Sequence, residues 1–278
     1  FSSDPGGVVA APNVSRNMLL GWPNRVPGGA VTASAEVVGL GAGNLQNDQG
    51  SPDAAWQTPV GVTEARLRLD AGYTGYWRLF GVFRSNLGLQ AQVRWRVWQG
   101  TDYADAALEY DSGYVDAGVI FGFGQHVHVA PADAVGRTMQ FDVFDPLNPD
   151  GFLNIPLLYA GPGWQPRRNF GFASTMGRVS AGTRTVTRAG AVYPRLDWMA
   201  RTWDLALPAV ASGEVWGRVM SLDEHARRGN NVLFVPAPAS PDLNRESLFG
   251  TLEPTAQVGY GGPSREVRTW RATLTERL

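Results

Sequence analysis

Ten consecutive residues point most directly to the fold class: Leu89-Gln90-Ala91-Gln92-Val93-Arg94-Trp95-Arg96-Val97-Trp98. Apolar side chains occupy every second position, and up to position 96 the positions between them are polar. A period of two is typical of a β-strand with one buried face. The sequence therefore predicts a strand over 89–98, with Trp98 on the polar face and its ring packed under neighbouring arginine side chains.

The same alternation recurs over 64–70, 137–145 and 265–276, and shorter strands are expected around 177–188, 198–207 and 232–235. Gly and Pro, with 34 and 19 copies, punctuate these runs. Regularly spaced short strands with such turns predict a mainly all-β protein.

One segment, 212–229, has a helical rather than an alternating pattern. Val215, Trp216, Val219, Met220 and Leu222 form a stripe at helical spacing. Ser212 is expected to cap the start of the helix, and Gly229 follows its end.

A turn-rich stretch, 144–151, contains two prolines and an Asp-Gly pair, which a continuous central strand does not tolerate. We therefore expect two domains, 1–148 and 149–278. The second is expected to be β-rich and to carry the helix.

Composition excludes several classes of function. The 24 basic residues are all arginine and face 25 acidic residues, so the formal net charge of −1 predicts no nucleic-acid partner. The absence of cysteine excludes disulfides, thiol nucleophiles and cysteine-ligated metals. No apolar run predicts membrane insertion, and residues 1–7 do not resemble a secretory signal.

The first half resembles discoidin-like, galactose-binding type jelly rolls. The residues that carry this resemblance follow that family's order: the strand 31–36, Ala42-Gly43-Asn44-Leu45, Trp56-Gln57-Thr58, the strands 65–70 and 77–82, and Ser85-Asn86-Leu87 before the strand 89–98. The resemblance implies an N-terminal jelly-roll β-sandwich. Such folds often hold a structural calcium ion, but no residue here is assigned to one.

The second half resembles tail proteins of double-stranded DNA bacteriophages, prophages and gene-transfer agents. The matching stretches are 145–152, 154–161, 231–236, 247–252 and 270–277. This resemblance implies a structural component of a phage tail, either a tail tip or a minor tail protein, located in the virion. Its partners would be other copies of itself, through symmetric contacts, and neighbouring tail proteins. No catalytic residue and no cofactor are predicted.

His126 and His128 would project from one face of a strand, at a spacing that two metal ligands can use. The third histidine, His225, falls on the expected helix, so further ligands would have to come from elsewhere. The alternative is a pair of surface histidines on the polar side of an edge strand, and no metal-binding residue is predicted.

Other motifs are incomplete. The stretch 145–151 lacks the ligand spacing of a calcium hand and is better explained as a turn. The glycines of 38–43 do not match a dinucleotide or phosphate loop and are better explained as a flexible loop. No Gly-x-Ser-x-Gly elbow is present, which argues against a serine hydrolase.

Five acidic residues accompany Tyr103, Tyr110 and Tyr114: Asp102, Asp105, Glu109, Asp111 and Asp116. Proteins that bind or cleave sugars often place acidic residues beside tyrosines. The same residues are equally typical of a polar loop and strand edge, and we favour this second interpretation. Carbohydrate binding to a cell-surface glycan is the alternative function, and glycan cleavage stays open as a third.

Overall fold

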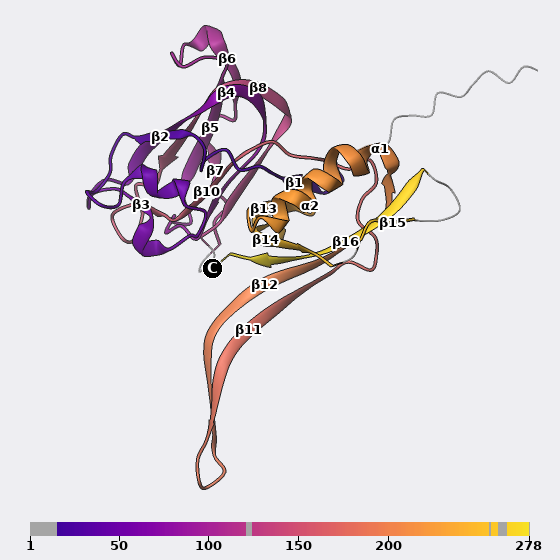
Figure 1. Cartoon of the computed structure of the whole chain (residues 1–278). Coiled ribbons are helices and arrows are strands. Elements are labelled where there is room, and N and C mark those ends of the chain that lie inside the picture. The colour runs from indigo at the N-terminus through magenta and orange to yellow at the C-terminus, as the bar shows by residue number, and fades with distance from the viewer. Residues whose placement is uncertain (1–15, 121–123, 256, 261–265, 278) are drawn as a thin grey trace, which may run out of the picture.

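The computed structural model describes residues 16–120, 124–255, 257–260 and 266–277. Residues 1–7, which were compared with a secretory signal above, lie outside these ranges. The protein is mainly β, with two large antiparallel sheets and one longer helical segment in the described part (Figure 1). No helix in the described part is long and apolar enough to cross a membrane.

The first sheet has the strand order β10-β4-β8-β5-β6, with β2 paired to β4 and β7 to β5. Its strands are β2 (Ala30–Ala33), β4 (Glu64–Phe83), β5 (Gln92–Trp98), β6 (Leu108–Asp111), β7 (Val115–Asp116), β8 (His126–Phe144) and β10 (Leu157–Gly161). A small pair, β3 (Trp56–Gln57) and β9 (Asn154–Ile155), contributes Trp56 and Ile155 to the same buried core. This arrangement is the expected jelly-roll sandwich.

The long strand β4 joins two segments that the sequence resemblance treats as separate strands. Its pairing with β8 shifts between Asp70 and Gly75 and again between Trp77 and Leu79. Such irregularities change which alternate residues face the core. Leu67 and Leu69 point into the core before the shifts, and Phe80 and Val82 do so after them.

The strand predicted over 89–98 is observed as β5, which begins three residues later, at Gln92. Val93, Trp95 and Val97 are buried as expected. Trp98 is also buried, at 2% exposure, so its expected place on a solvated face is wrong. The Arg96 guanidinium does lie over its ring, at 5.2 Å, while Tyr103 packs edge-on against it.

The second sheet has the order β1-β13-β14-β16-β12-β11, with β15 paired to β16. Its strands are β1 (Leu19–Gly21), β11 (Thr175–Val186), β12 (Val192–Ala211), β13 (Asn231–Val235), β14 (Leu248–Pro254), β15 (Gly259–Tyr260) and β16 (Val267–Glu276). The closing strand predicted over 265–276 is confirmed, because Trp270, Ala272 and Leu274 are buried.

The predicted helix is present as α1 (Ser212–Glu214), a π-helical turn (Val215–Val219) and α2 (Met220–Arg227). Val215, Val219 and Leu222 pack on the second sheet, but Trp216 is 75% exposed. Successive residues of a helix are about 100° apart, so Trp216 points away from the face that Val215 presents to the sheet. Ser212 makes no capping bond, because it is already the first helical residue and Ala211 takes the cap position. A short helix, α3 (Leu243–Glu246), was not predicted.

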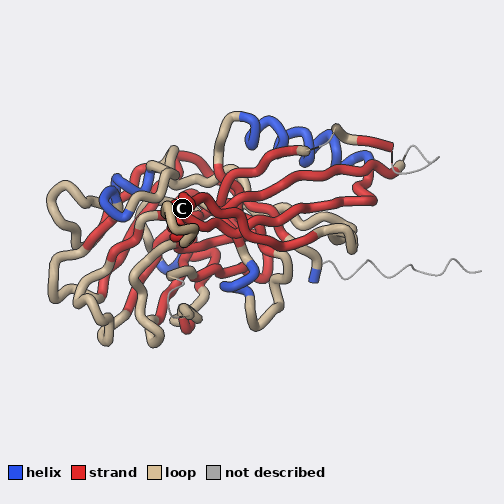
Figure 2. Tube along the Cα trace, turned by 90° about the horizontal axis from the view of Figure 1, so that it is seen from below, coloured by secondary structure: helices blue, strands red, loops and turns tan. Residues whose placement is uncertain are grey.

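The two sheets pack face to face through a shared apolar layer. Leu19, Leu233 and Phe249 of the second sheet meet Leu79 and Tyr159 of the first. The opposite face of the second sheet carries the helix, so the body is layered from helix to sheet to jelly roll (Figures 1 and 2).

The expected division at 148/149 remains a proposal, and the sheets distribute the chain differently near it. Strands β9 and β10, at residues 154–161, belong with the jelly roll. Strand β1, near the start of the chain, pairs with β13 of the second sheet.

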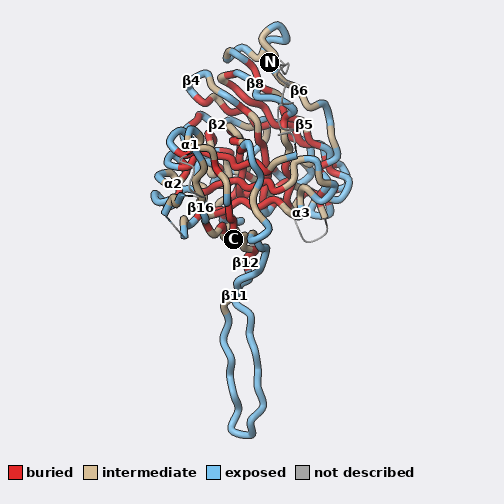
Figure 3. The backbone as a smooth tube through the Cα atoms, turned by 90° about the vertical axis from the view of Figure 1, so that its right-hand side faces the viewer, coloured by how far each residue is buried: buried red, intermediate tan, exposed pale blue. Residues whose placement is uncertain are grey.

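Strand β11 and the first eight residues of β12 form a two-stranded ribbon, which we call the arm (residues 175–199; Figures 1 and 3). Its base, residues 175–177, lies beside the part of β12 that pairs with β16, and the rest of the arm leaves the body. Pairing of β12 with β16 begins only at Thr202, so the outer edges of the arm have no strand neighbour in the described part of the chain.

Candidate functional site

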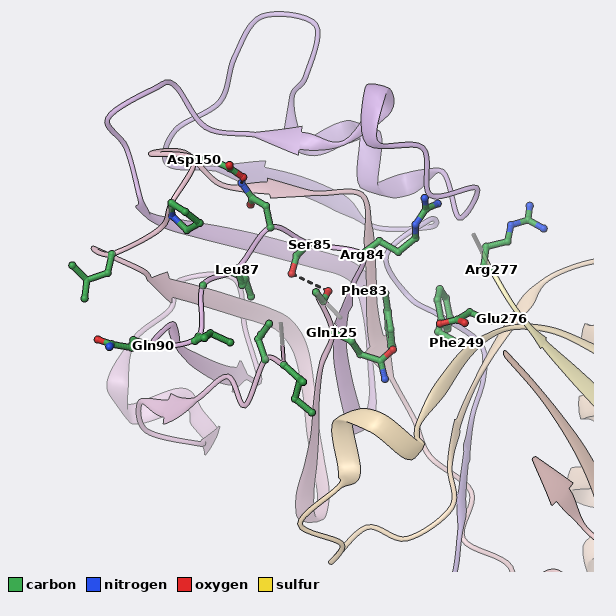
Figure 4. Close-up of a pocket in the computed structure, with 18 residues that line it drawn as sticks. Phe83, Arg84, Ser85, Leu87, Gln90, Gln125, Asp150, Phe249, Glu276 and Arg277 are labelled. Atoms are coloured by element: carbon green, nitrogen blue, oxygen red, sulfur yellow. Dashed lines mark hydrogen bonds between the residues drawn. The ribbon is translucent and has the colours of Figure 1, made fainter. Parts of the chain in front are cut away.

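A cleft of about 780 Å³ opens where the jelly roll meets the second sheet (Figure 4). Its described lining comes from the loop after β4 (83–90), the approach to β8 (119–120 and 124–125), the turn at 147–150, and Phe249, Glu276 and Arg277 of the second sheet. The cleft therefore combines segments that are distant in sequence and belong to both layers.

A network of polar side chains lies at the base of the cleft. The buried Gln125 side chain donates to the carbonyls of Asn244 (2.6 Å) and Ser247 (2.9 Å). Its Oε1 accepts a 2.9 Å hydrogen bond from Arg201 of β12. Arg201 also pairs with both carboxylate oxygens of Glu276. Charge-assisted bonds of this kind hold the two layers in register.

The walls of the cleft are mainly apolar, and apolar and polar side chains share its rim. Leu89 and Leu147 expose most of their side chains at the opening. Asp150 accepts a 2.9 Å bond from Asn86, and Arg84 donates to the carbonyl of Gly50 at 2.8 Å. Glu276, the other carboxylate of the described lining, accepts from Arg201.

Sequence reasoning found one part of this site and missed the other. The stretch Ser85-Asn86-Leu87 and the turn that contains Asp150 were singled out by resemblance. The Gln125–Arg201–Glu276 network was not, because its members are about 75 residues apart and only strand pairing brings them together.

His126 and His128 do share one face of a strand, with ring centroids 6.3 Å apart. The expectation that they lie on the surface is wrong, because His126 is buried and His128 is partly buried. This end of β8 pairs with β4, whereas β5 pairs only with residues 138–144 of β8. His126 bonds the carbonyl of Ala117 through Nδ1 (2.8 Å) and accepts from the Trp95 indole (3.1 Å), and His128 bonds the Tyr110 hydroxyl (2.6 Å).

Burial lowers the pKa of both histidines to about 4, because the charged imidazolium is disfavoured in the core. Their ring nitrogens hydrogen-bond within the jelly roll. The described residues contain no group of three or more metal-ligating side chains. His225 lies apart on α2 and bonds the carbonyl of Asn231 at 3.2 Å.

The stretch 145–151 is a turn, as the sequence favoured. Asn148 donates to the carboxylate of the buried Asp145 at 2.8 Å, and the amide of Gly88 donates to the same oxygen at 2.8 Å. Among the buried side-chain atoms of this turn in the described part, only the other oxygen of Asp145 lacks a hydrogen-bond partner. Ca²⁺ takes six to eight oxygen ligands, and the described residues hold no group of three or more acidic or histidine side chains that could supply them.

The glycine-rich stretch 38–43 folds into an ordered turn rather than a loose loop. Val37 and Leu40 form a bridge, and a 3-10 turn (Ala42–Gln46) follows. The Glu36 carboxylate accepts from the amide of Ala42 at 2.9 Å, which anchors the turn.

The acidic cluster lies at one end of the jelly roll and is not arranged as a catalytic pair. Asp111 forms a two-pronged ion pair with Arg94, which lowers the pKa of its carboxyl. A general acid needs a raised pKa, so Asp111 is unsuited to that role. Asp102, Asp105, Glu109 and Asp116 are exposed, as in the favoured interpretation of a polar loop and strand edge.

The tyrosines of this cluster are largely engaged within the protein. Tyr103 lies under Arg68 at 4.0 Å, and Tyr110 bonds His128. Tyr114 is 54% exposed and lies 5.6 Å from the Arg94 guanidinium. The cluster therefore leaves one tyrosine ring substantially open to solvent.

The sequence matches no protein-family model and no curated protein. Similar solved structures cover about half of the chain. A GH29 fucosidase of Ruminococcus gnavus, in complex with fucose, is 14% identical at a TM-score of 0.39, over 51% of this chain and 27% of that one.

Smaller proteins match over nearly their whole length. Chitosan-binding module 1 of a Paenibacillus sp. IK-5 chitosanase/glucanase is 12% identical, with a TM-score of 0.39, over 51% of this chain and 100% of the module. A Streptococcus pneumoniae fucose-binding module is 9% identical, with a TM-score of 0.37, over 50% of this chain and 94% of that one. These structures are carbohydrate-binding modules and have no counterpart of the tail role suggested by the sequence resemblance. The likenesses are too distant to assign a ligand.

Proposed function

We propose that this chain is a structural subunit that assembles with copies of itself through the arm. The observation that carries this proposal is that the arm is exposed on both faces and along both edges. One face presents Val186, Leu196 and Met199, and the other presents Val179, Tyr193 and Trp198, as the strand register dictates.

A two-stranded ribbon is at best marginally stable in water when it packs on nothing. Free strand edges and exposed apolar side chains are features that proteins normally cover. Leu196 and Tyr193 are 60% and 63% exposed, although both side chains are large and apolar or amphipathic. A subunit that inserts this arm into an assembly would cover both features at once.

The setting we propose for this assembly is a phage tail, and the protein would then be located in the virion. That part of the proposal is supported by the sequence resemblance over 145–152, 154–161, 231–236, 247–252 and 270–277. The arm supports self-assembly in any setting.

The test compares the native mass of the full chain with that of an arm-trimmed variant, by light scattering and electron microscopy of the same samples. Residues 180–199 are replaced by Asn-Gly, which joins the paired residues Val179 and Ala200 by a tight hairpin and retains Arg201. Trp216→Ser, which removes an exposed aromatic outside the arm, is the matched control.

We expect rings, tubes or oligomers from the full chain and from Trp216→Ser, and monomers from the trimmed chain. A full chain that stays monomeric at all accessible concentrations would overturn the proposal. So would a folded, trimmed chain that assembles as the full chain does.

A second candidate function is binding of a cell-surface glycan, and the cleft is the observation that favours it. Sugars present apolar ring faces edged by hydroxyl groups, and the cleft offers an apolar wall with Asp150, Asn86, Gln90 and Arg84 at or near its rim. Similar solved structures include modules named for chitosan and fucose binding, which makes these sugars sensible first probes.

A glycan array with the full chain tests this candidate. Leu147→Arg places a long charged side chain at the mouth of the cleft, and Val60→Arg is the control at an exposed apolar position outside it. We expect binding that Leu147→Arg abolishes and Val60→Arg retains. An array without signal above background, or equal binding by both variants, would contradict it.

A further inference from the structure

The arm carries a net positive charge in a chain that is close to neutral. Residues 175–199 contain four arginines (Arg178, Arg184, Arg188 and Arg195) and one acid (Asp197), so their net charge is +3. All four arginines are exposed, and the ion pair found within the arm is that of Arg195 with Asp197, at 3.4 Å.

The opposite charge is concentrated at one end of the jelly roll. Residues 102–111, which we call the acidic tip, contain Asp102, Asp105, Glu109 and Asp111 and no basic residue. Asp111 is paired with Arg94, but the first three are exposed and form no ion pair with the described residues. Tyr103 anchors this segment by packing on Trp98.

The acidic tip and the arm lie at opposite ends of the molecule. Strand β6 and the turn before it are at the top of Figures 1 and 3, and the arm points away from the body at the bottom. An arm therefore cannot reach the tip of its own chain, and any contact between them joins two copies.

We propose that the arm of one copy docks on the acidic tip of the next, a contact that rests on the proposed assembly function and names its partner surface. Opposite charges favour this pairing, whereas arm-to-arm packing would bring two sets of four arginines together. A contact between two different patches is heterologous, so its repetition produces a closed ring or an open filament.

Charge reversal at each surface tests this contact. The arm variant is R184E/R188E, the tip variant is D102R/D105R, and the control D53R/E64R reverses two exposed acids elsewhere on the jelly roll. Assembly is followed by light scattering as a function of protein and salt concentration.

We expect the arm variant and the tip variant each to need about tenfold or more protein to assemble, and the control to behave as the native chain. Mixing the arm and tip variants restores both contacts, so assembly recovers in the mixture. Added salt should weaken the native assembly, because it screens exposed charges.

The outcomes separate this inference from the function on which it rests. If arm trimming abolishes assembly but the tip variant assembles normally, the arm docks elsewhere and this inference fails while the proposed function stands. If the native chain is monomeric, both fail. Folded variants whose mixture does not recover would also overturn the contact.

Discussion

Among single residues, Asp48 carries a half-buried carboxyl group where the two layers meet. It accepts a 3.0 Å hydrogen bond from Asn24, while its backbone carbonyl accepts from Asn231 of β13 at 2.7 Å. Burial raises the pKa of Asp48 to about 6. The folded protein therefore holds this proton more tightly than the unfolded chain does, and Asp48 contributes less stability as pH rises from about 4 to 6.

We expect Asp48→Asn to raise the free energy of unfolding by about 2 kcal/mol at pH 7.5, because it removes a half-buried charge and keeps an oxygen to accept from Asn24. At pH 4.5 the gain should largely disappear. Urea unfolding at both pH values measures the difference. A variant less stable than the native protein at pH 7.5 would contradict the prediction.

His126 and His128 have the opposite effect on the free energy of unfolding over a similar pH range. Because the pKa values of His126 and His128 fall from 6.5 to about 4, the unfolded chain binds more protons between these pH values. The stability that they contribute is complete above pH 6.5 and is lost as the pH falls towards 4.

In the variant His128→Phe, the free energy of unfolding should therefore decrease less than in the native protein as the pH falls from 6.5 to 4. Phenylalanine keeps an aromatic ring near Phe80 and Tyr110 but cannot take up a proton. The expected reduction is up to about 3 kcal/mol in the pH-dependent part of the unfolding free energy. Thermal melts across this pH range measure it, and an unchanged pH profile would count against it.

At the scale of elements, two glycines of the helical segment differ in whether their backbone conformation requires glycine. Gly217 lies in the π-helical turn with open space where a Cβ would be, whereas Gly229 ends the segment at a φ of +78°. The left-handed region at Gly229 disfavours any residue with a Cβ.

We expect Gly217→Ala to raise the free energy of unfolding by about 0.5–1 kcal/mol and Gly229→Ala to lower it by about 1 kcal/mol. Both changes add the same methyl group, so each serves as the control for the other. Chemical denaturation measures the pair, and equal shifts in one direction would contradict this account.

For the whole molecule, Arg201 is one of the polar links between the layers, through its hydrogen bond to Gln125. It joins β12 to Glu276 of β16, to carbonyls at Arg245 and Ser247, and to Gln125 of the jelly roll. The same residue lies beside the base of the arm, where β12 begins its pairing with β16.

Arg201→Met should lower the free energy of unfolding by about 3 kcal/mol, because it leaves the Glu276 charge without its partner. Arg201→Lys should recover part of this loss, since lysine keeps the charge but not the fork of donors. Denaturation with limited proteolysis measures both effects. Native-like stability of Arg201→Met would refute this role.

The sequence by itself determined the elements whose pattern is local. The alternation at 64–70, 137–145 and 265–276 and the stripe over 212–229 predicted real strands and a real helix, because periodicity depends only on near neighbours. The acids of 102–116 were likewise correctly interpreted as a polar loop and strand edge.

Only the tertiary structure decided which face of each element is covered. Trp98 and the histidines of β8 are buried because Tyr103, Tyr110 and Trp95 come to lie against them. The sequence predicted one strand of the arm, over 177–188, as an ordinary strand, but it placed the next strand at 198–207 and missed residues 192–197. The arm is exposed because the pairing of β16 with β12 ends at Thr202. This pairing joins residues far apart in the sequence, so a local pattern cannot predict where it ends.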